Sequence, residues 1–325
     1  MIRDRVAQAT TAALGARPVA RAAQMLWPSR LRVIDFHDVA DAGAFERLVL
    51  EILGHYHPVS EEQVRAAMAG SGSLPERAVW LTFDDGHRSV VDRGLDVLVR
   101  HGVPATFFVC PGLIEEGEPP WWELVFAAGS RGVGAHVGGV ERRGEDLVRA
   151  LKVVEDGHRR EVVESLRTVG IEALDLDALV LDRASVDRWL DAGLSIGSHT
   201  WDHPCLHRCD EAGQVAQIER ADSWLKEVIG RQPSFAYPNG DHTALAESTL
   251  AALGYDVALL SDHRLADVEG PPLRMSRLRL SAVASPRRTR AVLSGLHSAI
   301  YARALRHRLT GPAWVERSSG AGTEV

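Results

Sequence analysis

The chain has 325 residues, of which 45% are hydrophobic and 25% charged, which is typical of a globular protein with a sizeable core. Its formal net charge of −7 excludes the dominant basic field of a nucleic-acid-binding protein, and we expect no nucleic-acid partner. The three cysteines show no paired spacing and predict no disulfide framework.

The N-terminal segment, residues 1–30, is rich in alanine and arginine and is predicted to form a helical extension. It lacks the continuous apolar stretch of a secretory signal, and no window of the chain approaches the length of a transmembrane span. We therefore expect a cytoplasmic protein. The N-terminal helix either packs on the outside of the domain or makes peripheral contact with a membrane surface.

Short apolar runs and helical periodicities then alternate along the chain. Strands are predicted at 31–36, 78–83, 103–110, 193–198, 233–238, 255–260 and 277–281, and helices at 41–53, 60–69, 89–102, 211–229, 243–253 and 286–308. Residues 111–185 interrupt this order with Gly/Pro-rich turns and helical patterns, which predicts a largely helical insertion. The alternation predicts an α/β fold, and we expect a distorted (β/α) barrel of about seven strands over 31–310, followed by a flexible tail over 311–325.

Chemically capable side chains follow four of the predicted strands. They are His37, the pair Asp84–Asp85, the histidines His199 and His203, and Asn239. In barrels and open parallel sheets, functional sites form where the carboxyl ends of the strands meet. The sequence therefore predicts one site to which all four segments contribute.

The histidine segment "SHTWDH" and the aspartate segment "TFDDG" together suggest a metal site. If residues 199–203 form a helical turn, the i, i+4 spacing places both imidazoles on one face. With Asp85 they would make a His/His/carboxylate set with open positions, which suits catalysis. Taken alone, Asp84 and Asp85 could instead fix a turn, and the histidines could lie exposed on a loop. A zinc site using Cys205 and Cys209 would need a CxxC pair, which the chain lacks.

Four motifs give the chain a resemblance to a known family: "TFDDG" (82–86), "HGVPATFFV" (101–109), "SHTWDH" (198–203) and "FAYPNG" (235–240). With them the chain resembles the polysaccharide deacetylases, the NodB-homology group of carbohydrate esterase family four. The resemblance runs from about Leu31 to Leu280, apart from the insertion. Within the family, the chain is similar to the subgroup with a FAYP-type groove segment. It implies a NodB-like distorted barrel.

The resemblance also implies roles for residues of these motifs. Asp84 becomes the general base, and Asp85, His199 and His203 become ligands of a divalent metal. Zinc is expected first, with cobalt, nickel and manganese as alternatives. The backbone N–H of Asn239 would help to hold the oxyanion that develops during amide hydrolysis.

Four further residues are predicted to bind or position the substrate. Thr200 matches the position that orients the histidine turn, and Trp201 could stack on a sugar. Tyr237 and Pro238 belong to the segment that lines the groove.

The chain departs from the family pattern at two positions, so the usual arginine and the usual general-acid histidine must come from elsewhere in the sequence. Ala236 stands where many members have an arginine, and Arg277 from the last predicted strand fits that role, with Arg274 and Arg279 nearby. Such an arginine would keep Asp84 ionised by charge proximity. The usual late Leu-x-His-Asp segment is not recognisable, so His37 is the candidate general acid. The alternative is that His37 only supports the metal site through hydrogen bonds.

The sequence thus predicts a metal-dependent deacetylase that hydrolyses N-acetyl groups of a carbohydrate or glycoconjugate, with Asp84 activating the attacking water. The expected substrate is an N-acetylated sugar, glycolipid or polysaccharide. One alternative is a hydrolase of a non-sugar amide or imide on the same fold. Another is a catalytically silent carbohydrate-binding protein.

Overall fold

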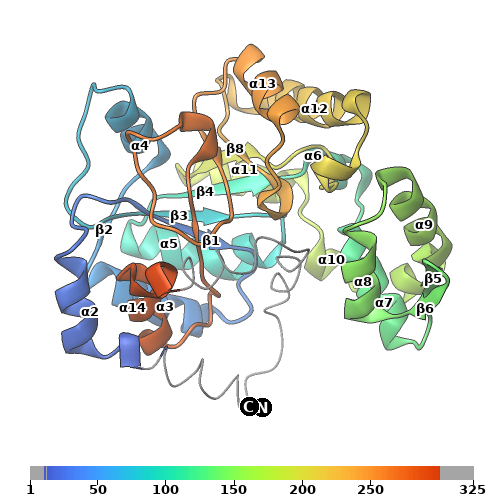
Figure 1. Cartoon of the computed structure of the whole chain (residues 1–325), viewed down its shortest axis with the longest axis horizontal. Helices are drawn as coiled ribbons and strands as arrows, with labels where there is room; N and C mark the ends of the chain where they lie inside the picture. Colours follow the sequence, from blue (N-terminus) through green and yellow to red (C-terminus); the bar gives the residue numbers. More distant parts are fainter. Residues whose placement is uncertain (1–10, 12, 301–325) are drawn as a thin grey trace.

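A curled parallel sheet forms the centre of the molecule (Figure 1). In this computed structural model the chain is described at residue 11 and over 13–300. Seven strands lie side by side in the order β10–β1–β3–β4–β7–β8–β9, and β2 pairs with β3 outside this path. Their bounds are β1 (Arg32–Phe36), β2 (His57–Pro58), β3 (Ala78–Phe83), β4 (Ala105–Val109), β7 (Ser195–Ser198), β8 (Phe235–Ala236), β9 (Ala258–Leu259) and β10 (Leu278–Arg279). The predicted distorted barrel of about seven strands is confirmed.

One short contact closes the ring of strands. Leu259 in β9 forms an isolated parallel bridge with Met275, which precedes β10. The Met275 N–H donates to the Ala258 carbonyl at 2.9 Å, and the Leu260 N–H donates to the Met275 carbonyl at 2.8 Å. β10 in turn pairs with β1. We call the Leu259–Met275 contact the seam.

The strands are apolar because helices cover the outer face of the sheet. All residues of β1, β3 and β4 are buried, as expected for parallel strands covered on both faces. Phe36 of β1 stacks on Phe83 of β3. Phe83 meets Phe107 of β4 and Trp189 of the covering helix α11 (Arg183–Asp191) edge-on. This aromatic cluster fixes the strands that carry the aspartate segment.

The covering helices lie close to their predicted positions. They are α2 (Arg17–Gln24), α3 (Ala42–Leu53), α4 (Glu61–Met68), α5 (Leu95–His101), α11 (Arg183–Asp191), α12 (Glu211–Ile229), α13 (Ala244–Ala252) and α14 (Pro286–Leu293). The helix predicted over 89–102 begins with a π-helical turn, Val90–Gly94, before α5. The helix predicted over 286–308 is interrupted, because α14 ends at Leu293 and Gly295 adopts a φ of 83°. Residues 296–300 are helical again, and 301–308 lie outside the described residues.

Between β4 and β7 the chain forms a separate helical layer. It comprises α6 (Pro111–Glu116), α7 (Trp121–Ser130), the hairpin β5 (Ala135–Val137) and β6 (Val140–Arg142), α8 (Gly144–Leu151), α9 (Asp156–Glu172) and α10 (Leu176–Leu179). Helices α7, α8 and α9 enclose a hydrophobic cluster of their own, which includes Trp121, Leu147 and Val163. This insertion lies at the right-hand end of the molecule in Figure 1, away from α2 and α14.

The two ends of the chain are described only in part. α2 falls within the predicted N-terminal extension, whereas residues 1–10 and 12 and the tail predicted over 311–325 lie outside the described residues. None of the described helices is long and apolar enough to cross a membrane.

Candidate active site

The polar residues that follow the strands meet at one edge of the sheet. Backbone pairing continues one residue beyond two of the strands, and this fixes where their side chains emerge. The Asp84 N–H donates to the Phe36 carbonyl at 2.9 Å, and the His199 N–H donates to the Val109 carbonyl at 2.9 Å. Because the strands are parallel, the aspartate and histidine segments leave the sheet on the same side.

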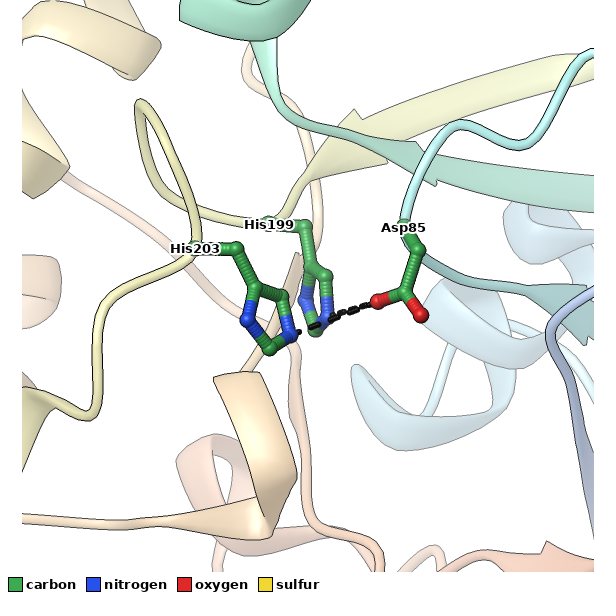
Figure 2. Close-up of side chains that lie close together, drawn as sticks. All are labelled: Asp85, His199 and His203. Carbon is green, nitrogen blue, oxygen red and sulfur yellow. Dashed lines mark ion pairs between the residues drawn. The ribbon is translucent and has the colours of Figure 1, made fainter. Parts of the chain in front are cut away.

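Asp85, His199 and His203 form a compact set of donor atoms (Figure 2). One carboxylate oxygen of Asp85 lies 3.3 Å from the Nε2 atom of His199 and 3.3 Å from that of His203. In a tetrahedral zinc site with bonds of about 2.0–2.1 Å, ligand atoms lie about 3.3 Å apart. The three side chains therefore fit a divalent cation, and the set leaves a further coordination position for water or substrate.

The histidine segment is not the helical turn that the spacing suggested. Thr200 and His203 adopt left-handed backbone conformations, with φ of 67° and 59°. His203 directly precedes Pro204, a position that disfavours the right-handed helical region. The loop instead brings the two imidazoles together through its turn, with ring centroids 4.8 Å apart.

Backbone strain is concentrated at this site. Among the described residues, six that are not glycine have a positive φ, and four of them belong to the site: Asp85, Thr200, His203 and Asn239. Each such conformation costs on the order of 1–3 kcal/mol and persists only when the surroundings impose it. The fold therefore maintains an unfavourable backbone to place these groups.

Hydrogen bonds and charges set the state of the ligand side chains. The His199 Nδ1–H donates to the Ala236 carbonyl at 2.7 Å, which orients the ring so that its Nε2 atom faces Asp85. Burial lowers the pKa of His203, favouring the neutral imidazole that can bind a metal. Burial alone would raise the pKa of Asp85, but hydrogen bonds from His199 and His203 hold it well below its usual value.

Arg277 binds Asp84 inside the barrel. Its two terminal nitrogens donate to the two Asp84 carboxylate oxygens at 2.7 and 2.6 Å, and its Nε–H donates to the Leu260 carbonyl at 2.8 Å. Arg277 is completely buried and Asp84 is 2% exposed. Of the three candidate arginines, Arg277 is the one that meets the aspartate, whereas Arg274 pairs with Glu247 on the surface. The contact fixes the orientation of the carboxylate and balances its charge.

Asp35 joins this group and was not anticipated from the sequence. It is buried in β1, where one carboxylate oxygen lies 3.7 Å from Arg277 and 3.8 Å from the Nδ1 atom of His37. The signal that could have revealed it is a lone acid in the otherwise apolar core of "LRVIDF".

The side chain of His37 is 53% exposed and faces three carboxylates. Desolvation lowers its pKa, but the charges of Asp35, Asp85 and Asp84 outweigh this and raise the pKa above its ordinary value. His37 thus keeps its proton to higher pH than a free imidazole does.

Asn239 lies in a left-handed turn directly after β8, with a φ of 57°. Hydrogen bonds from the Gly240 N–H to the Tyr237 carbonyl, at 2.8 Å, and from the Asp241 N–H to the Pro238 carbonyl, at 2.9 Å, close the turn. Neither bond uses the Asn239 N–H. The role of the Asn239 N–H as a donor to the oxyanion stays a prediction.

The four residues predicted to bind or position the substrate make contacts within the protein. Thr200, Tyr237 and Pro238 are buried. The Thr200 hydroxyl accepts a hydrogen bond from the His203 N–H at 3.2 Å, and the Tyr237 hydroxyl donates to the Leu273 carbonyl at 3.1 Å. The guanidinium of Arg220 lies over the Trp201 ring, 4.0 Å from its centroid. Contact of these four residues with a substrate stays a prediction.

The insertion contacts the histidine loop, residues 199–203, which the sequence did not predict. The Trp121 indole N–H donates to the His203 carbonyl at 3.2 Å, and the Trp122 ring meets the His203 ring edge-on at 4.5 Å. Arg160 donates to both carboxylate oxygens of Asp202 at 2.9 and 3.0 Å. Helices α7 and α9 therefore hold His203 in place.

Cys205 and Cys209 do not join the metal set. Both are free thiols, and burial raises the pKa of Cys205 to about 11 and that of Cys209 to about 12. A protonated thiol is a poor zinc ligand.

The chain resembles known proteins in sequence and in fold. A family model described as polysaccharide deacetylase matches residues 71–258, more than half of the chain. A chitin deacetylase from Pestalotiopsis sp is 41% identical over 80 residues, covering 24% of this chain and 27% of that protein. A poly-β-1,6-N-acetyl-D-glucosamine N-deacetylase from Escherichia coli (strain K12) is 36% identical over 99 residues, covering 26% of this chain and 15% of that protein. The chain thus spans less than a third of the length of these two relatives.

Two solved structures share the fold. IcaB from Ammonifex degensii aligns with a TM-score of 0.53 at 19% identity, covering 82% of this chain and 97% of that one. The Streptococcus pyogenes deacetylase PplD in complex with acetate aligns with a TM-score of 0.52 at 17% identity, covering 80% and 96%. Placement in the subgroup with a FAYP-type segment stays a prediction. The family model and the barrel together show that the chain belongs to the polysaccharide deacetylase family.

Proposed function

We propose that this protein is a metal-dependent carbohydrate deacetylase that hydrolyses the N-acetyl group of a sugar in a polysaccharide or glycoconjugate. Two of the relatives above are named as deacetylases of chitin and of poly-β-1,6-N-acetyl-D-glucosamine, which are both N-acetylated polymers. The observation that carries the proposal is that a candidate base and a candidate cation site lie side by side. A carboxylate oriented by Arg277 lies beside a His/His/Asp set that fits a cation.

Asp85, His199 and His203 would hold the cation, and zinc suits their two nitrogen donors and one oxygen donor best. Cobalt, nickel and manganese are the alternatives. When bound, the ion would supply Lewis acidity that polarises the acetyl carbonyl and makes water easier to deprotonate.

The protein's own groups supply the proton transfers. Asp84 would accept a proton from the attacking water, and the Asn239 N–H would donate to the oxyanion that develops on the acetyl oxygen. His37, which the surrounding carboxylates keep protonated to higher pH, would protonate the departing amine. The products are acetate and a free amine.

The test is acetate release by the metal-reconstituted protein. The panel should contain N-acetylated monosaccharides, sugar nucleotides, glycolipids, chitin oligomers and β-1,6-linked glucosamine polymers. We expect release from at least one class, loss of release with a chelator and recovery when zinc is added back. Metal binding without release from any of these sugars would overturn the proposal and favour a non-sugar amide or a silent binding protein.

A further inference from the structure

Exposed apolar side chains gather on three helices that pack against one another. Ten large apolar side chains are exposed in the described part of the chain, and seven of them lie on α2, α3, α14 or the segments beside them: Val19, Met25, Leu26, Leu50, Leu53, Val283 and Ile300. Met25 is 78% exposed and Leu26 is 64% exposed. We call the outward surface of these three helices the three-helix face. Exposed apolar side chains that gather in one region, unlike single scattered ones, are typical of an interaction surface.

Helix α2 buries Ala20 and Ala23 against the domain. Its outward side exposes Val19 and Ala22 together with two arginines, so this side mixes apolar and basic groups. Met25 and Leu26 directly follow the end of the helix and are exposed as well. We call Val19, Ala22, Met25 and Leu26 the outward stripe.

Arginines surround this stripe. Within RPVARAAQ of α2 and PRRTRAVL of α14 there are five arginines and no acid, although the whole chain carries a net charge of −7. The third helix, α3, adds one arginine and two glutamates. Arg290 links the helices, because its Nε–H donates to the Gly15 carbonyl at 2.9 Å and its Nη1 donates to Glu51 of α3 at 2.8 Å. The other four, Arg17, Arg21, Arg287 and Arg288, are exposed to solvent.

We propose that the three-helix face binds the surface of an anionic lipid membrane. In this arrangement Met25 and Leu26 enter the boundary between headgroups and acyl chains, and the four exposed arginines contact lipid phosphates. Amphipathic helices with this combination of apolar tips and basic residues bind at membrane interfaces, and guanidinium groups pair well with phosphate. The proposal is independent of the deacetylase activity.

Two features favour a lipid surface over other occupants. Met25 and Leu26 are the two most exposed large apolar side chains in the described part of the chain, as suits a soft boundary. A second copy docked symmetrically through the same face would bring the two sets of arginines together, which like-charge repulsion opposes. The insertion lies at the other end of the molecule in Figure 1, so membrane contact through α2 and α14 would not cover it.

The test is co-sedimentation of the full-length protein with vesicles of phosphatidylcholine containing phosphatidylglycerol, compared with pure phosphatidylcholine. We expect binding to the anionic vesicles alone. Raising the ionic strength from about 0.1 M to about 1 M shortens the Debye length from about 10 Å to about 3 Å and should release the protein. The double variant Arg17→Gln/Arg21→Gln should bind at least tenfold more weakly, since each basic residue near the surface contributes about fivefold. Met25→Ser/Leu26→Ser should also bind at least tenfold more weakly.

The matched control is Val99→Ser/Val140→Ser. These side chains are 55% and 51% exposed but lie outside the three helices, and their replacement should leave vesicle binding unchanged. Acetate release from a water-soluble substrate should be the same for all variants, which checks that they are folded. Equal binding to both kinds of vesicle, or an equal loss in the control, would overturn the proposal. So would self-association that Met25→Ser/Leu26→Ser abolishes while vesicles bind nothing.

Discussion

The two halves of the candidate site are held by different parts of the molecule. Asp84 is fixed from within the barrel, by a buried guanidinium that reaches it from the other end of the sequence. His203 lies on a strained loop and is held from outside, by tryptophans of the inserted helices. The comparison indicates that the orientation of the base is a property of the barrel, whereas the geometry of the cation site depends on the insertion. Changes in the two regions should therefore affect catalysis and metal affinity separately.

The largest effect is expected from Asp84→Asn. The amide cannot accept the proton of the attacking water, so turnover should fall by about 10²–10⁴-fold or more. Cation binding, measured by calorimetry, should remain because Asp85, His199 and His203 are unchanged. Wild-type activity in this variant would contradict the assignment of Asp84 as the base.

Arg277→Met should damage both activity and stability. It leaves the buried carboxylates of Asp84 and Asp35 without their cation, which typically costs about 3–5 kcal/mol in the free energy of unfolding. Urea denaturation measures this loss. The matched control is Arg274→Gln, which breaks an exposed pair with Glu247 and should change stability little. Similar losses in the two variants would show that the buried pair has no special role.

Arg160→Gln tests the insertion side of the comparison. Loss of the two bonds to Asp202 should loosen the histidine loop and weaken cation affinity by about tenfold, the lower end for residues that orient metal ligands. Turnover at saturating metal should stay close to that of the wild type. Arg149→Gln, which removes another ion pair of the insertion, with Glu145, serves as the control. A fall in turnover at saturating metal would contradict the separation of the two halves.

Asp35→Asn should move the pH dependence of activity. A general acid works in its protonated form, so activity is present below the pKa of His37 and is lost as the pH rises through it. Asp35 is the leading charge that raises this pKa, and a bound cation would offset the contribution of Asp85 but leave Asp35 in place. Removing the Asp35 charge should therefore shift the alkaline limb of the kcat/KM profile to lower pH. His37→Gln should remove that limb, and an unchanged limb in both variants would exclude His37 as the acid.

The smallest effect is expected from Asn239→Gly. The proposed donor is the backbone N–H, and glycine adopts a φ of 57° without strain, so activity should stay within about twofold of the wild type. Asn239→Ala places a Cβ in the left-handed region at a cost of about 1–2 kcal/mol and should be less stable. A large loss of activity in the glycine variant would instead implicate the Asn239 side chain.

The sequence predicted the barrel and the meeting of the polar segments, because both follow local patterns. Predicted strands end directly before Asp84 and His199, and parallel strands bring their ends to one edge. The choice of Arg277 came from the family resemblance and not from a local pattern, and the structure pairs this residue with Asp84. The roles of the site residues likewise rest on the resemblance and stay predictions.

The features that escaped prediction depend on contacts between distant segments. The regular spacing of His199 and His203 suggested a helical turn, yet tertiary packing and Pro204 impose left-handed residues instead. Tyr237 belongs to the groove motif, but its hydroxyl donates a hydrogen bond to the buried Leu273 carbonyl. Nothing in the local pattern around Trp121 indicates that its indole N–H reaches a residue 82 positions away. Such contacts are set by the assembled fold.

The seam makes the proposed catalytic groups sensitive to local opening of the barrel. The ring closes there through one backbone bridge, and Arg277 follows Met275 by two residues on the same strand segment. The Arg264 N–H donates to the Arg277 carbonyl at 3.1 Å and the Ser276 hydroxyl donates to Asp262 at 2.9 Å, so a few hydrogen bonds support the bridge. Opening at the seam would withdraw the guanidinium from Asp84 while the helices and the remaining strands stay folded. Hydrogen exchange should therefore show the amides of Leu260 and Met275 opening before those of β3 and β4. Under mild denaturing conditions, activity should disappear before the helical signal does.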